Sequence, residues 1–302
     1  MIISISRRCD IPRFAFDWFL EKLDAGFVEV KNPFNSRQIK KVSLLPPSPG
    51  RMPGESAEVL AFWTRDPFFI LEHTEELEKR GYRFFVMTTL TSYPAILEPN
   101  MPPAEQVIQT LKNLAHKITA ERVIWRYDPV FLSSLTDYQF HLRNFSKLAG
   151  RLKGTVRRVI VSVYDEYSSA EKRLAALEQN GKLRRLEHYE KRDGQTPVLN
   201  PVVRQLLIEL AGIARAEGME IQSCAEEDLA GCLQSEDCPQ SGSCGIRSGA
   251  CIDGDLITKL FGLKPPGKDR GQRRSRCRCV ESTDIGSYGA CPAGCVYCYA
   301  RR

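Results

Sequence analysis

A short loop near the end of the sequence carries three cysteines at a spacing typical of metal binding. Cys291, Cys295 and Cys298 are separated by three and then two residues, as C-x3-C-x2-C. Three thiolates on one tight loop can ligate three irons of a 4Fe-4S cube and leave the fourth iron open to a small molecule. Zinc is the structural alternative, although it prefers four ligands. Gly294 allows the tight turn, and Tyr297 provides an apolar ring beside the cluster.

The distribution of cysteines favours metal ligation over disulfides. Of 11 cysteines only Cys9 precedes residue 224, and the segment 224–302 contains none of the four histidines. An odd number of cysteines in a chain without an export signal is poorly explained by disulfides, because the cytosol keeps thiols reduced. The absence of histidine from this segment favours all-thiolate sites, for zinc or for iron-sulfur clusters.

A second metal site is predicted from the remaining thiols. Its candidate ligands are Cys224, Cys251, Cys277 and Cys279, which could hold a second 4Fe-4S cluster or a structural zinc. We favour the cluster. Three further cysteines in a Ser/Gly-rich loop are alternative ligands, so the membership of the site stays open: Cys232, Cys238 and Cys244. Cys9 is predicted to pack as a small apolar group at the end of the first strand, with a position facing the cluster as the alternative.

A basic run near these thiols has two interpretations. It comprises Arg270, Arg273, Arg274, Arg276 and Arg278. Arginines would lower the pKa of the thiols and offset an anionic cluster. They could also contact nucleic acid, but the run contains no interleaved aromatic residue on which bases could stack. All four histidines are expected on helices beside charged residues, where surface positions are common.

Composition and charge indicate a globular protein. The 302 residues include 43 Lys+Arg and 37 Asp+Glu, a formal charge of +6, with 42% hydrophobic and 26% charged residues. These proportions leave enough apolar side chain for a sizeable core and exclude a fibre or a disordered tail. No stretch approaches the roughly 18 apolar residues of a membrane span, and the first residues lack a secretory core. We expect a cytoplasmic protein that does not bind membranes.

Six β-rich runs alternate with helical patterns along the first two thirds of the chain. The predicted strands are 2–5, 59–63, 84–87, 123–125, 159–163 and 220–224. The predicted helices are 14–23, 67–79, 103–118, 138–148, 169–191 and 201–217. A hairpin is expected between residues 28 and 45.

This alternation predicts an α/β fold with a parallel sheet, because parallel neighbours need a crossover connection. We expect a partial parallel (β/α)6 barrel of the TIM type, followed by a C-terminal cysteine-rich iron-sulfur segment. The first domain would span 1–223, with a hairpin insertion at about 27–45, and the segment 224–302 would pack on the barrel mouth. A doubly wound sheet shows the same alternation, but no Gly-rich phosphate loop follows the first strand.

Polar residues follow each predicted strand, at the edge where α/β proteins hold their active sites. These runs are 7–10, 64–66, 88–89, 126–128, 164–166 and 224–226. Solvated loops and helix starts would produce the same pattern. Arg65, Arg126 and Asp128 are the candidate catalytic residues, because each lies one to three positions beyond a tryptophan that could desolvate its charge. Glu226 and Tyr297 are the candidate cofactor-binding residues.

Several motifs resemble known families. Residues 291–300 resemble the cluster loop of radical S-adenosylmethionine (SAM) enzymes, and 288–301 are similar to that loop in spore-photoproduct-lyase-like proteins. The whole chain resembles domain-of-unknown-function family 1848, whose three-cysteine cluster is C-terminal. The segments that carry this resemblance are 3–12, 32–35, 62–65, 123–129, 224–226, 251–253 and 284–286.

The resemblance implies a function. Cys291, Cys295 and Cys298 would bind a 4Fe-4S cluster with SAM on the open iron, and reduction by a ferredoxin or flavodoxin would generate a 5′-deoxyadenosyl radical. The substrate, small molecule or nucleic acid, is not indicated. Two features depart from the radical SAM pattern: the cluster loop follows the sheet instead of the first strand, and no Gly-Gly-Glu segment follows the second strand. A non-catalytic zinc or iron-sulfur module, on nucleic acid or in DNA repair, is the alternative.

Overall fold

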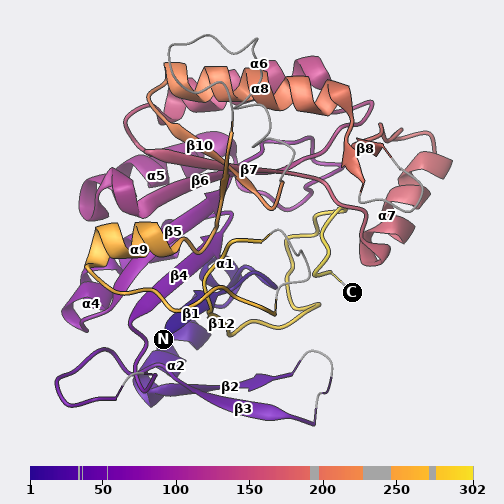
Figure 1. Ribbon diagram of the computed structural model, residues 1–302. Helices are drawn as coiled ribbons and strands as arrows, with labels where there is room; N and C mark the ends of the chain where they lie inside the picture. Colours follow the sequence, from indigo (N-terminus) through magenta and orange to yellow (C-terminus); the bar gives the residue numbers. More distant parts are fainter. Residues whose placement is uncertain are drawn as a thin grey trace.

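An eight-stranded sheet forms the centre of the computed structural model, which describes residues 1–32, 35, 37–52, 54–190, 197–226, 246–271 and 277–301 (Figure 1). The strand order is β11-β10-β7-β6-β5-β4-β1-β12, and all neighbours are parallel. The strands are β1 (Ile2–Ile5), β4 (Val59–Thr64), β5 (Arg83–Thr89), β6 (Val123–Val130), β7 (Arg158–Val163), β10 (Glu220–Cys224), β11 (Arg247–Gly249) and β12 (Thr283–Asp284).

Both faces of the sheet are covered, which explains why the strands are nearly continuous apolar runs. All six residues of β4 are buried. Alternate residues belong to two separate cores: Ile3, Phe62, Phe84 and Trp125 on one face, and Ile2, Trp63, Phe85 and Ile124 on the other. The sheet therefore separates a larger core from a smaller one.

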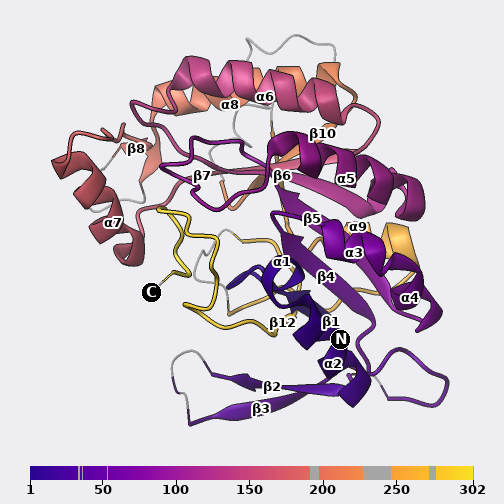
Figure 2. The same ribbon diagram turned by 180° about the vertical axis from the view of Figure 1, so that it is seen from behind.

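Helices from the first two thirds of the chain cover the larger core. They are α1 (Ile11–Phe14), α2 (Phe16–Ala25), α3 (Phe68–Glu72), α4 (Thr74–Lys79), α5 (Ala104–Ile118), α6 (Tyr138–Leu152), α7 (Ser168–Gln179) and α8 (Pro201–Ala216), with a short 3-10 turn at Ala120–Arg122. Helix α9 (Gly254–Phe261) packs on the smaller core, and Figures 1 and 2 show α9 and α3 on opposite faces of the sheet.

The predicted α/β class with a parallel sheet is confirmed. All six predicted strands are present and adjacent in chain order, as barrel-type winding requires and doubly wound topology does not. The sheet has two edges, β11 and β12, and no pairing among the described strands joins them, so closure into a barrel is not observed. Both edge strands and α9 come from the segment after residue 224, where no regular element was expected.

The smaller elements agree with the predictions from sequence to different degrees. The expected hairpin forms from β2 (Phe27–Lys31) and β3 (Ile39–Ser43), and a second small pair is β8 (Tyr189–Glu190) with β9 (Val198–Leu199). The prediction of a helix from 169 to 191 was too long. Helix α7 ends at Gln179, and Gly181 adopts a left-handed φ of 65° just beyond it. No helix in the described part of the chain has both the length and the apolarity to cross a membrane.

The edge strand β12 is attached to the start of the chain by a buried carboxylate. Asp284 accepts hydrogen bonds from Ser4 Oγ at 2.9 Å, Ser6 Oγ at 2.6 Å and the Arg7 backbone N–H at 2.8 Å. A Cβ at Gly286 would lie 2.0 Å from Ser6 Oγ, so only glycine fits this close approach. The residues after β12 therefore start at the carboxyl edge of the sheet.

Candidate functional site

The three-cysteine loop (residues 291–298) packs against the loop that follows β5. The Val296 N–H donates to the Leu97 carbonyl at 3.0 Å, and Asn100 Nδ2 donates to the Pro292 carbonyl at 2.8 Å. Gly294 has a left-handed φ of 78°, and a Cβ there would lie 3.0 Å from the ring of Pro99. The predicted glycine turn is thus present, and it permits close contact between the two loops.

Arg173 of α7 holds the far side of the three-cysteine loop. Its Nε donates to the Val296 carbonyl at 3.0 Å, its Nη2 to the Cys298 carbonyl at 2.6 Å and its Nη1 to the Arg301 carbonyl at 3.0 Å. Figure 2 shows the C-terminal segment, in yellow, running beside α7. One side chain therefore satisfies three backbone acceptors of a segment without regular structure.

The three thiols share one electrostatic environment. Cys295 is buried, and Cys291 and Cys298 are half-buried. Burial raises the pKa of Cys291, and it raises the pKa of Cys295 to about 11, with Arg65 opposing the shift. A further thiol near this loop is Cys9, whose pKa is raised by burial and by the charges of Asp284 and Cys291. Cys9 thus lies near the three-cysteine loop as well as at the end of β1.

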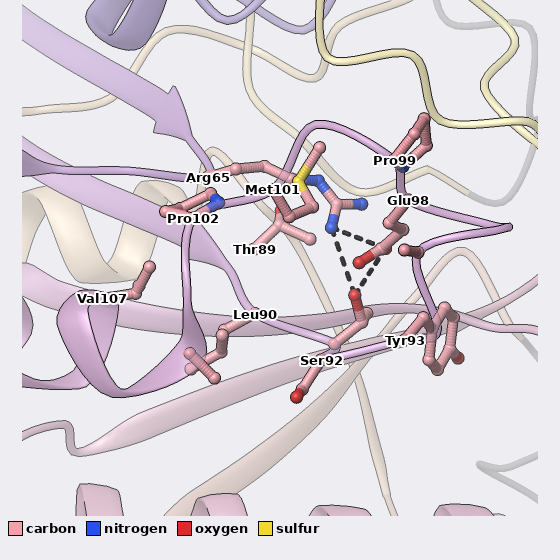
Figure 3. Close-up of a pocket in the computed structure, with 13 residues that line it drawn as sticks. Arg65, Thr89, Leu90, Ser92, Tyr93, Glu98, Pro99, Met101, Pro102 and Val107 are labelled. Carbon is pink, nitrogen blue, oxygen red and sulfur yellow. Dashed lines mark hydrogen bonds and ion pairs between the residues drawn. The ribbon is translucent and has the colours of Figure 1, made fainter.

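A buried ion pair lies beneath the loop. Arg65, at the end of β4, places Nη1 2.7 Å from Glu98 Oε1 and donates from Nη2 to the Tyr297 hydroxyl at 2.8 Å. Tyr297 donates in turn to Glu98, as does Thr91 Oγ1 at 2.6 Å. The side chains of Arg65 and Glu98 are 14% and 2% exposed. Figure 3 shows the two side chains pointing toward each other.

This ion pair keeps Arg65 charged. Burial alone would lower the pKa of Arg65, but Glu98 and Tyr297 raise it well above its ordinary value. The Arg65 backbone N–H also donates to Asp10 Oδ2 at 2.8 Å. Burial raises the pKa of Asp10 to about 6, and its other oxygen accepts from the N–H of Arg13 to cap α1. The ends of β1 and β4 are therefore joined at the site.

A cavity of about 180 Å³ opens beside this network (Figure 3). Its walls include Arg65, Thr91, Tyr93, Glu98 and Met101, all from β4 or from the end of β5 and the loop after it. It is smaller than the roughly 300–1,000 Å³ of pockets that enclose drug-sized ligands. The cavity therefore has room for a small group and not for a whole nucleoside.

Arg126 and Asp128 form a second group of predicted residues. Arg126 Nη2 pairs with Asp128 Oδ2, and Ser162 Oγ donates to Asp128 Oδ1. The Arg126 guanidinium lies 4.7 Å from the centre of the Trp63 ring. The tryptophan that precedes it in sequence, Trp125, belongs to the core on the other face of the sheet. No hydrogen bond or ion pair among the described residues connects this group to Arg65.

Glu226 is held elsewhere along the same edge. It is buried, and it accepts from the Val163 N–H at 3.2 Å and from the Tyr189 hydroxyl at 3.2 Å. The structure therefore places Glu226 at the end of β7, while Tyr297 lies over Arg65. The two candidate cofactor-binding residues belong to different parts of the carboxyl edge.

The structure gathers the four cysteines of the predicted second site. Cys251 Sγ lies 3.5 Å from Cys224 Sγ, and hydrogen bonds from the thiols of Cys251 and Cys277 lower the pKa of Cys279. Among the described residues, no three or more His, Cys, Asp or Glu side chains already converge on a position for a metal ion. Several predicted participants lie outside the described residues: Cys232, Cys238, Cys244, Arg273, Arg274 and Arg276.

Sequence reasoning missed several residues of this region. Glu98 lies 11 residues beyond the predicted strand 84–87, in an irregular Pro-rich loop, so its position carried no signal. Arg173 lies in a charged helix and was indistinguishable from its neighbours. The histidines were also misjudged: His141 and His188 are buried, and His188 is not helical. His141 shares a helical stripe with Phe145 and Leu148, a signal that was available.

Comparison with known proteins identifies a family. One matching solved structure is a mutant of spore photoproduct lyase, at 15% identity and a TM-score of 0.33, covering 56% of this chain and 51% of the lyase chain. The chain thus spans about half of that protein, and a TM-score this low does not establish a shared fold. No curated protein matches the sequence. The model of the domain of unknown function DUF1848 matches residues 2–300, so this chain belongs to the DUF1848 family.

Proposed function

We propose that this protein binds a 4Fe-4S cluster through Cys291, Cys295 and Cys298 and is an enzyme of the radical SAM type. The observation that supports this most is the position of the three-cysteine loop. It follows β12, a strand parallel to its neighbour β1, and so lies at the carboxyl edge of the sheet. Active sites of parallel α/β proteins lie at this edge.

The order of strands accounts for one departure from the radical SAM pattern. The loop comes last in the sequence, but the strand that precedes it lies beside β1 in space. A cluster loop that follows an edge strand next to β1 has the same relation to the sheet as one that follows a first strand. The late position in the sequence is therefore compatible with the proposal.

The donor set fits an iron-sulfur cluster. Three soft thiol ligands come from one short loop, and the Arg65 guanidinium lies close enough to Cys295 to stabilise its thiolate. Because burial raises the pKa of Cys291 and Cys295, these thiols are protonated at neutral pH and would release protons on metal binding. When bound and reduced, the cluster would supply the one-electron chemistry that cleaves SAM.

The protein's own residues would orient the reactants and exclude water. Tyr297 of the loop contacts Arg65 beneath it, and the small cavity beside Arg65 could accept one polar end of SAM or of a substrate. Arg126 and Asp128, beside Trp63, would face the substrate, and Glu226 would contact the cofactor. The proposed electron donor is a ferredoxin or flavodoxin.

Anaerobic reconstitution tests the proposal. We expect about four irons and four sulfides at the three-cysteine loop, and 5′-deoxyadenosine when SAM and dithionite are added. The triple variant Cys291→Ala/Cys295→Ala/Cys298→Ala should lose these irons, and the control Cys9→Ala, a thiol at the same edge outside the motif, should keep them. Unchanged iron in the triple variant would contradict cluster binding. Iron without 5′-deoxyadenosine would contradict the radical SAM assignment.

A further inference from the structure

Four cysteines from three separate segments meet on the smaller core of the sheet. Cys224 ends β10, Cys251 precedes α9, and Cys277 and Cys279 follow it. The sulfurs of Cys224 and Cys251 are 3.5 Å apart, and Cys279 interacts with the thiols of both Cys251 and Cys277. Cys277 and Cys224 also interact electrostatically. The contacts run from Cys224 through Cys251 and Cys279 to Cys277.

A buried reduced cysteine commonly packs as a small apolar group. Two features of these four cysteines differ from such packing. The Ile252 N–H donates to Cys279 Sγ at 3.4 Å, a contact that stabilises a thiolate more than a thiol. The guanidiniums of Arg7 and Arg126 interact with Cys279 and Cys251. Both guanidiniums are largely buried and also pair with carboxylates, Arg7 with Asp284 and Arg126 with Asp128, so the thiols lie in a charged environment and not among apolar groups alone.

Two hydrogen-bond donors near the four cysteines also lack acceptors. Trp63 Nε1 and Arg126 Nε are buried without a hydrogen-bond partner among the described residues. Trp63 belongs to the same core as Cys251, Cys277 and Cys279, and the Arg126 guanidinium stacks on its ring. Buried polar atoms are rarely unpaired, so this region has unused capacity to stabilise negative charge.

The sulfur spacing distinguishes a single ion from a cluster. Zinc–sulfur bonds of about 2.3 Å in a tetrahedral site place neighbouring sulfurs about 3.8 Å apart. The separation of 3.5 Å between Cys224 and Cys251 is close to this edge length. An iron-sulfur cube holds each thiolate on a different iron and keeps the sulfurs farther apart. The geometry therefore favours one metal ion over a second cube.

We propose that Cys224, Cys251, Cys277 and Cys279 bind one tetrahedral zinc ion. The contacts run from one cysteine to the next, so the four sulfurs do not surround a single point in this structure. Rotation of the side chains would bring the sulfurs around the ion when it binds. A divalent ion with four thiolates is doubly anionic, and Arg7 and Arg126 are the neighbouring cations. Binding would release the thiol protons to solvent. This site does not depend on the proposed cluster at the three-cysteine loop.

The zinc ion would connect opposite parts of the sheet. Cys224 lies next to the edge strand β11, whereas the chain after Cys279 continues to the other edge strand, β12. Four metal–sulfur bonds would fix this crossing segment on the smaller core. The site is therefore structural: it would hold in place the segment that leads to the three-cysteine loop.

Metal analysis and X-ray absorption of protein purified without oxygen test the proposal. We expect one zinc per chain with four sulfur neighbours at about 2.3 Å. The variant Cys291→Ala/Cys295→Ala/Cys298→Ala should keep this zinc, and Cys251→Ser/Cys279→Ser should lose it. Because the second variant could fail to fold, wild-type protein is also treated with a chelator, and the released zinc is compared with newly alkylated thiols.

The outcomes separate this proposal from the proposed function. Zinc retained in the three-cysteine variant supports the four-thiolate site even if no iron binds anywhere. Four irons that are lost only with Cys251 and Cys279 would overturn it in favour of a second cluster. Absence of zinc and iron at this site, or zinc release that exposes none of these four thiols to alkylation, would also overturn it.

Discussion

The buried ion pair beneath the three-cysteine loop makes a quantitative prediction. In the variant Arg65→Met the aliphatic stem is retained and the charge is lost, which leaves Glu98 buried at 2% side-chain exposure without a cation. Breaking a buried pair by removing one partner costs about 3–5 kcal/mol, because the remaining charge is uncompensated. This loss is a large part of the roughly 5–15 kcal/mol that stabilises a typical protein.

A double variant separates charge from packing. In Arg65→Met/Glu98→Gln the remaining amide is neutral and can still accept from Tyr297 and Thr91, so we expect a smaller loss of stability than in Arg65→Met alone. The assay is urea unfolding followed by tryptophan fluorescence, without oxygen and at matched metal content. The control is Lys79→Met, which breaks an exposed pair with Glu75 and should change the unfolding free energy by less than about 1 kcal/mol.

Two results would refute this reasoning. If Arg65→Met costs no more than Lys79→Met, the pair is not effectively buried. If the double variant costs the sum of the single variants Arg65→Met and Glu98→Gln, then Arg65 and Glu98 do not interact through their charges.

Three further predictions concern pH and the loop. Burial lowers the pKa of both His141 and His188 to about 4. The folding stability that each histidine contributes above pH 6.5 is therefore lost as the pH falls, by about 3 kcal/mol per histidine at pH 4. His141→Gln should therefore remove one histidine's share of this pH slope, and an unchanged slope would count against it. Arg173→Ala removes donors to three loop carbonyls, so chymotrypsin should cleave the C-terminal segment faster than in wild type; equal rates would show that Arg173 does not restrain it. Gly294→Ala should cost more than Gly262→Ala in thermal unfolding, because both positions are left-handed but only at 294 would a Cβ meet a neighbour, at 3.0 Å. Equal costs would show that this contact relaxes freely.

The sequence was informative about the parts of the fold that depend on local patterns. Continuous apolar runs identified the six central strands, since a strand covered on both faces needs such a run. The edge strands β11 and β12 are three and two residues long, and their pairing depends on β10 and β1, which are distant in sequence. Helix α9 is eight residues long and lies in a segment where the cysteines dominated the pattern.

The candidate site was predictable in residue types more than in partners. Arg65 was found because it follows a strand and a tryptophan, and the three-cysteine motif because its spacing is local. Glu98 acquires its role only when folding brings it to Arg65, 33 positions away, and to Tyr297, 199 positions away. No local sequence pattern indicates these contacts, because the order of strands in the sheet determines which distant residues come together.

The pairing of β12 with β1 also bears on the order of folding. Ser4 and Asp284 meet across 280 positions, and contacts between such distant residues close late because their loop entropy must be overcome first. The six central strands can assemble from neighbours before that closure. The thiols at 291–298 would then join an existing scaffold, so insertion of the proposed cluster would be among the last steps of maturation, and metal supplied earlier would meet unstructured peptide.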